Sequence, residues 1–81
     1  MGELSDDLRV FVADLARLSP ADLTPNGPLF ETGVIDSLNL VELVVFVEER
    51  CHIKVGAGDL TLDNWNTLEA IESYVARRTR P

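Results

Sequence analysis

The apolar residues near the start of the chain recur at the spacing of an α-helix. Steps of four, three, four and three residues separate Leu4, Leu8, Phe11, Leu15 and Leu18. This spacing places the five side chains on one stripe of a helix. Ser19 and Pro20 follow and favour a helix end. The pattern therefore predicts a helix over residues 4–18 whose apolar stripe faces a core.

A second helix is predicted over residues 36–51, with Asp36 as its N-cap and Ser37 at the first helical position. At about 100° per residue, one side collects Leu40, Leu43, Val44, Val47 and Cys51, with Phe46 beside them. This side is predicted to face the core. The opposite side collects Leu38, Val41 and Val45, interleaved with Glu42, Glu48 and Glu49. An apolar strip rimmed by carboxylates indicates a docking surface for a basic partner, although a helix buried on nearly all sides is the alternative.

The rest of the chain predicts an ordered loop and further short helices. Prolines and glycines punctuate residues 19–35, where Leu23, Leu29, Phe30, Val34 and Ile35 are expected to hold the loop against the core. Thr61–Trp65 predicts one helical turn. Asn66 and Glu69 have the spacing of a capping box before a last helix. Together these segments predict one all-α domain over residues 1–81, a small bundle of three longer helices and one short helix. We expect one core to contain Leu8, Phe11, Leu15, Leu43, Val47, Ile71 and Val75.

Charge is distributed unevenly along the chain. The 81 residues carry fourteen acidic and seven basic side chains, a net charge of −7. All of the excess acid lies before residue 50. An acidic surface of this kind argues against nucleic acid as a partner and favours basic protein surfaces. No apolar run has the length of a membrane span, and the N-terminus carries acids where a secretory signal has bases. We expect a monomeric, cytoplasmic protein without a membrane partner.

The residues available for chemistry do not favour an enzyme. The sequence has no glycine-rich phosphate loop, no CxxC pair and no metal-ligand spacing. Ser37 and the single histidine, His52, stand about 22 Å apart on the predicted helix, which excludes a hydrogen bond between them. Cys51 falls on the core side. A helical adaptor protein and a small serine-dependent enzyme nevertheless remain open from these residues alone.

The segment FETGVIDSLNLVELVVFVEER resembles the signature of the acyl and peptidyl carrier proteins. The family's motif of glycine, aspartate, serine and leucine matches Gly33, Asp36, Ser37 and Leu38. Its continuation along the recognition helix matches Val41, Glu42, Val45 and Glu49. A later motif before the last helix matches Asn64-Trp65-Asn66-Thr67, so the resemblance spans residues 5–78.

The resemblance implies an acyl-carrier-protein-like fold and a function. Ser37 would carry 4′-phosphopantetheine, donated by coenzyme A, with Asp36 as the helix cap beside it. The thiol of this arm would hold an acyl or aminoacyl group as a thioester, and the protein itself would have no catalytic activity. Leu38, Val41, Glu42, Val45 and Glu49 would contact the partners: a phosphopantetheinyl transferase, an acyl-loading or adenylating enzyme, and synthase or acyltransferase domains.

Within the family, the connector and residues 61–71 are more similar to discrete carriers of bacterial secondary metabolism. Such carriers bring extender or starter units to polyketide assembly. An aminoacyl or peptidyl carrier of a nonribosomal pathway and a fatty-acid carrier are the alternatives. The second half of the chain, with four acids and five bases after residue 49, departs from the strongly acidic fatty-acid carriers. The sequence predicts a freestanding carrier.

Overall fold

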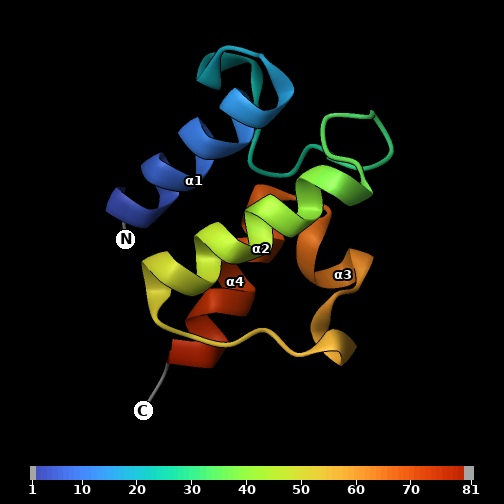
Figure 1. The fold of residues 1–81 in the computed structure, drawn as a ribbon. Helices are drawn as coiled ribbons and strands as arrows, with labels where there is room; N and C mark the ends of the chain where they lie inside the picture. The colour runs from blue at the N-terminus through green and yellow to red at the C-terminus, as the bar shows by residue number, and fades with distance from the viewer. Residues whose placement is uncertain (1, 80–81) are drawn as a thin grey trace.

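The computed structural model of the protein describes residues 2–79, which form α1 (Gly2–Ala16), α2 (Ser37–Cys51), α3 (Leu62–Trp65) and α4 (Leu68–Thr79). Single 3-10 turns at Pro20–Asp22 and Ala57–Asp59 interrupt the two long connections. In Figure 1, α2 crosses the middle of the molecule, with α1 to its upper left, α4 behind it and α3 at the right. The predicted all-α bundle of three longer helices and one short helix is confirmed.

The first helix ends earlier than its apolar spacing predicts. Arg17 has a left-handed backbone (φ 58°), and the N–H of Leu18 donates to the carbonyl of Ala13 at 2.8 Å. This arrangement ends a helix, because the N–H of Leu18, which lies beyond the helix, provides the hydrogen-bond partner of the Ala13 carbonyl in the last turn. The prediction that the helix continues to residue 18 is therefore wrong, and Leu18 is exposed. Val12 and Ala13, which the predicted stripe left out, are buried in its place.

The core lies between the long helices and is closed by α3. Five of the seven predicted core residues are buried, and Phe11 and Leu15 are half-buried against them. Trp65 at the end of α3 is the largest fully buried side chain, at 1% exposed. The buried set is completed by residues from the loop and from α4: Leu23, Leu29, Ile35, Leu68 and Tyr74.

The last helix is capped by a different residue from the one that the sequence pattern predicts. Thr67 Oγ1 accepts a hydrogen bond from the backbone N–H of Ala70 at 2.9 Å, so Thr67 is the N-cap of α4. The predicted capping box of Asn66 and Glu69 is therefore wrong. Asn66 instead follows α3, and the backbone N–H of Glu69 donates to the carbonyl of Pro25 in the long loop at 2.8 Å. Tertiary hydrogen bonds have replaced the local ones that the spacing suggests.

Asp59 joins the second connection to α3 and α4. Its backbone carbonyl accepts hydrogen bonds from Trp65 Nε1 at 2.9 Å and from Asn64 Nδ2 at 3.0 Å. Its carboxylate accepts one from the Tyr74 hydroxyl at 2.8 Å. Arg78 donates to the same hydroxyl at 2.8 Å and forms an ion pair with Asp59 at 3.4 Å. These contacts fix the short α3 against α4.

The described part of the chain contains no helix that is both long enough and apolar enough to span a bilayer.

Candidate functional site

Ser37 is the first residue of α2, and its side chain is exposed. Asp36 caps the helix: its backbone is extended (φ −116°), and its Oδ1 accepts a hydrogen bond from the N–H of Asn39 at 2.9 Å. The Asp36 carbonyl accepts the first helical bond, from the N–H of Leu40 at 2.9 Å. Local sequence therefore fixes where α2 starts, and this start presents Ser37 to solvent.

The loop before Ser37 is ordered, as predicted. Leu29 and Ile35 are buried, and the N–H of Ile35 donates to the carbonyl of Leu29 at 3.0 Å. Between them the chain turns at Gly33, whose φ of 81° lies in the region that side chains disfavour. The backbone is thus fixed in the core only two residues before Ser37.

Asn66, which is 36 residues beyond Phe30 in the sequence, holds this loop in place. Its backbone carbonyl accepts a hydrogen bond from the N–H of Leu29 at 2.6 Å, and its Oδ1 accepts one from the N–H of Phe30 at 3.0 Å. Sequence reasoning missed this role. The nearest signal was the resemblance of residues 64–67 to a family motif, which marked the position without indicating its contacts.

A serine in this position is suited to a phosphodiester. The first N–H groups of an α-helix have no carbonyl partner within the helix, and the positive end of the helix dipole favours an anion there. Of the first three N–H groups of α2, that of Asn39 is already bonded to Asp36. The exposed Ser37 hydroxyl is open to a modifying enzyme, and the buried Ile35 holds its backbone in place. These features fit a covalently attached phosphopantetheine.

The face of α2 next to Ser37 is apolar and exposed, as predicted. Leu38 is 77% exposed, Val41 62% and Val45 44%, while Leu43 and Val47 on the opposite side are fully buried. Leu40, Val44, Phe46 and Cys51 are half-buried against the core. The carboxylates of Glu42 and Glu49 are exposed beside the apolar strip. We call Leu38, Val41, Glu42, Val45 and Glu49 the docking face, after the partner contact that the family resemblance implies for them.

Glu48 does not belong to that face, in contrast to the prediction. It is half-buried, and its Oε2 accepts a hydrogen bond from the backbone N–H of Val55 at 2.8 Å. The physical reason is that the connector folds back along the last turn of α2. The backbone N–H of Val55 needs an acceptor there, and the Glu48 carboxylate provides it. Two of the three predicted glutamates therefore remain on the docking face.

His52 and Cys51 lie at the far end of α2 from Ser37. His52 adopts the left-handed conformation that ends the helix (φ 57°), which separates it from Ser37 by the whole length of α2. Cys51 is half-buried, and burial raises the pKa of its thiol, an effect that nearby Arg50 opposes in part. These positions do not bring a base or a thiol to Ser37.

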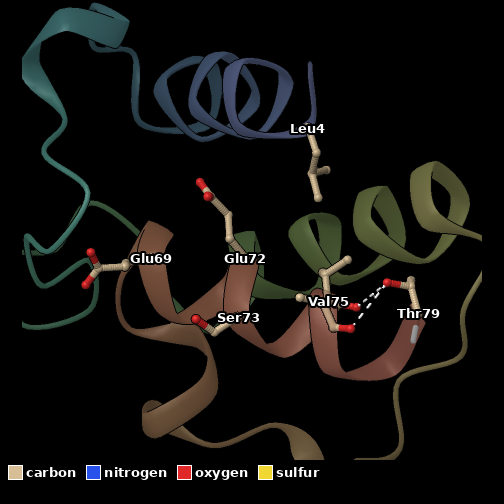
Figure 2. A pocket seen from close by; sticks show the side chains of 7 residues that line it. Leu4, Glu69, Glu72, Ser73, Val75 and Thr79 are labelled. Atoms are coloured by element: carbon tan, nitrogen blue, oxygen red, sulfur yellow. Dashed lines mark hydrogen bonds between the residues drawn. The ribbon is translucent and has the colours of Figure 1, made fainter. Parts of the chain in front are cut away.

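A separate hollow of about 420 Å³ lies between α1 and α4. Figure 2 shows Leu4 of α1 and Glu72 of α4 pointing into the space between the two helices, with Val75 and Thr79 further along α4. Leu4 is in the first turn of α1 and Thr79 ends α4, and both helix ends lie across the molecule from the start of α2 (Figure 1). The hollow is therefore distinct from the Ser37 site.

Comparison with known proteins agrees with the geometry. The family model for the phosphopantetheine attachment site matches residues 6–75. D-alanyl carrier proteins of Streptococcus pyogenes serotype M5 (strain Manfredo) and serotype M49 (strain NZ131) are each 38% identical over 63 residues, covering 78% of this chain and 72% of theirs. A chain in a structure described as the crystal structure of FAD-dependent dehydrogenase superposes with a TM-score of 0.74. It covers 83% of this chain and 96% of that chain at 24% identity, which shows the fold alone.

The family match covers most of the chain, and the relatives are similar along most of its length. Members of this family carry phosphopantetheine covalently, and the fold and the helix start described above provide for it. The chain belongs to the phosphopantetheine-binding carrier protein family.

Proposed function

We propose that this protein holds an acyl or aminoacyl group as a thioester on a phosphopantetheine arm attached to Ser37, and delivers it from one biosynthetic enzyme to another. The observation that carries the assignment is the exposed hydroxyl at the first residue of α2, beside the Asp36 cap. The arm supplies the reactive thiol when bound. The protein contributes position: the helix start favours the phosphodiester, and the fixed loop keeps the attachment point in one place. No catalytic activity of its own is part of this proposal.

Attachment at Ser37 is tested by intact mass. Wild type and Ser37→Ala are incubated with coenzyme A and a phosphopantetheinyl transferase, and we expect a single pantetheine mass gain on wild type and none on the variant. Ser37→Ala should fold, because the hydroxyl is exposed and Asp36 provides the cap; the cost is at most about 1 kcal/mol. Ser73, exposed on α4, provides the matched control, since Ser73→Ala should be modified like wild type. A mass gain on Ser37→Ala would contradict the assignment.

The cargo has two candidate classes. The D-alanyl carrier relatives favour an aminoacyl group, loaded by an adenylating enzyme. The resemblance of residues 61–71 to discrete carriers of secondary metabolism instead supports an acyl starter or extender unit for polyketide assembly. Incubating the modified protein with an adenylating enzyme, ATP and D-alanine tests the first class by mass. Mass spectrometry of the loaded protein from its native host identifies the group in either case.

The docking face is proposed as the contact for these enzymes. Members of this family work with a transferase and with loading or synthase enzymes, each of which must reach the serine. Leu38 follows Ser37 directly, and Val41 and Val45 continue the same side of α2. Glu42 and Glu49 add negative charge, which speeds the encounter with a basic surface more than it strengthens the complex.

A further inference from the structure

Two acceptors on one residue hold the loop before Ser37 at two consecutive amides. The backbone carbonyl of Asn66 accepts the N–H of Leu29 at 2.6 Å, and its side-chain Oδ1 accepts the N–H of Phe30 at 3.0 Å. Asn66 is the C-cap of α3 and follows the fully buried Trp65, so both acceptors belong to a segment that is fixed in the core. In Figure 1 the loop runs to the start of α2 on the same side of the molecule as α3.

The two held residues continue the connection toward the start of α2. The carbonyl of Leu29 accepts the N–H of Ile35 at 3.0 Å, and the carbonyl of Phe30 accepts the N–H of Gly33 at 3.2 Å. Each bond to Asn66 therefore leads, through one residue, to a second bond on the far side of the turn. We call these four hydrogen bonds the Asn66 bracket. The bracket ends two residues before the first residue of α2.

The bracket matters for the first turn of α2 because a helix end depends on contacts outside the helix. The first N–H groups of a helix have no partner within it, and helix ends open locally at a lower cost than the core does. Ile35 is 1% exposed and anchors the chain immediately before the Asp36 cap. If the loop leaves the core, Ile35 leaves with it and the first turn frays. The Ser37 hydroxyl then no longer has one fixed position.

We propose that Asn66 is a positioning residue for the transfer of phosphopantetheine to Ser37. This inference rests on the proposed function and adds a residue that lies outside α2. In the transfer, the Ser37 oxygen bonds to the phosphorus that carries the pantetheine arm, and the pyrophosphate bond of coenzyme A breaks. Adenosine 3′,5′-bisphosphate leaves, and the serine proton passes to a base of the transferase or to water. Asn66 keeps the loop closed, and the closed loop holds the hydroxyl in place for this attack, which a small misplacement slows steeply.

The experiment removes the side-chain acceptor alone. Asn66→Ala loses the bond to Phe30 and keeps the backbone carbonyl that holds Leu29. Asn64→Ala is the matched control. Asn64 is also half-buried, and its side chain donates to the Asp59 carbonyl and accepts from Arg77, each at 3.0 Å, so its partners lie in the second connection and in α4.

The kinetics of pantetheine transfer are measured for both variants with one transferase, below their melting temperatures. We expect kcat to fall about three- to tenfold for Asn66→Ala, which corresponds to the loss of one hydrogen bond that holds the loop. KM should stay at the wild-type value, because most of the docking face lies beyond the first turn of α2. Asn64→Ala should leave both constants within about twofold of wild type, since its bonds are not part of the Asn66 bracket.

Asn66→Asp separates positioning from a general loss of stability. Aspartate has the same length and presents a carboxylate oxygen in place of Oδ1, so it can accept the Phe30 N–H and should return kcat to within about twofold of wild type. Amide hydrogen exchange gives a readout that needs no transferase. The N–H groups of Gly33 and Ile35, whose own partners are unchanged, should exchange about three- to tenfold faster in Asn66→Ala. They should exchange at the wild-type rate in Asn66→Asp and in Asn64→Ala.

Equal kcat values for Asn66→Ala and Asn64→Ala would overturn the proposal. So would a lowered kcat for Asn66→Asp when Ile35 exchanges at the wild-type rate. If Asn66→Ala does not fold, wild type decides: the N–H groups of residues 29, 30, 33 and 35 should exchange as one group, and unprotected exchange at Phe30 would overturn the inference. A wild type that gains no pantetheine mass would contradict the proposed function itself, on which the exchange rates do not depend.

Discussion

At the scale of single residues, position on α2 decides what each side chain does. Asp36 and Ser37 are neighbours, yet their side chains differ in role. The Asp36 carboxylate accepts a hydrogen bond from the helix backbone, whereas the Ser37 hydroxyl is exposed to solvent. Glu48 and Glu49 differ in the same way: Glu48 accepts a bond from the connector, and Glu49 lies on the docking face. A step of about 100° around the helix separates a structural role from a surface one.

Cys51 provides a prediction at this scale. Burial raises the pKa of its thiol, so little of the reactive thiolate is present near neutral pH. After pantetheine has been attached, the protein contains two thiols. We expect alkylation at pH 7.5 to modify the arm thiol quickly and Cys51 slowly, in two phases followed by mass. Cys51→Ala should remove the slow phase alone, and a single fast phase for both thiols in wild type would contradict this expectation.

At the scale of elements, long-range hydrogen bonds hold short segments that would be unstable alone. A helix of four residues such as α3 has too few internal bonds to persist in water. Its position comes from the burial of Trp65 and from the bonds that Asn64 and Trp65 donate to Asp59. In the same way, Asn66 connects the end of α3 to the loop that leads to Ser37. The proposed attachment point, Ser37, is therefore supported by a segment about thirty residues away in sequence.

The contact between Tyr74 and Asp59 predicts a loss of stability at high pH. Burial raises the pKa of Tyr74, and its hydrogen bond to the Asp59 carboxylate adds to this effect, while Arg78 opposes it. The folded state thus holds the phenolic proton more tightly than the unfolded state does. The contribution is complete below the ordinary tyrosine pKa of about 10 and is lost as pH rises through the raised folded value.

This prediction is measured by urea unfolding between pH 8 and 11. The chain has one tyrosine, so its phenolate absorbance reports the titration directly. Tyr74→Phe keeps the ring and removes the hydroxyl, and its stability should fall less over the same pH range. If both proteins lose stability in parallel, the titrating group is not Tyr74.

At the scale of the whole molecule, α2 is the only one of the described helices that both contributes to the core and provides the proposed docking face. Leu43 is fully buried and Val41, two residues earlier, is 62% exposed. Truncation of Leu43 to Ala leaves a cavity and should cost about 2–5 kcal/mol. Val41→Ala should change the free energy of unfolding by about 0.5 kcal/mol or less.

Urea denaturation midpoints of these two variants test the division of α2 into two faces. A small domain has a total stability of about 5–15 kcal/mol, so Leu43→Ala should show a clearly lowered midpoint or fail to fold. Similar shifts for the two variants would mean that the faces are wrongly assigned.

The sequence alone determined that the chain is helical, where α2 starts and which residues lie on its two faces. Periodicity of 3.6 residues and an aspartate cap are local signals, because the atoms concerned lie within one or two turns of each other. These signals fixed Ser37 at an exposed helix start and separated Leu43 and Val47 from Leu38, Val41 and Val45. The family motif covered the same segment.

Only the tertiary structure decided which groups meet across the molecule. The cap of α4 passed from Asn66 to Thr67, since Asn66 is used by the loop before Ser37. Phe11 and Phe46 formed a stacked pair beside the docking face. Such contacts depend on how the helices are arranged around a shared core, and the spacing within any one segment carries no information about that arrangement.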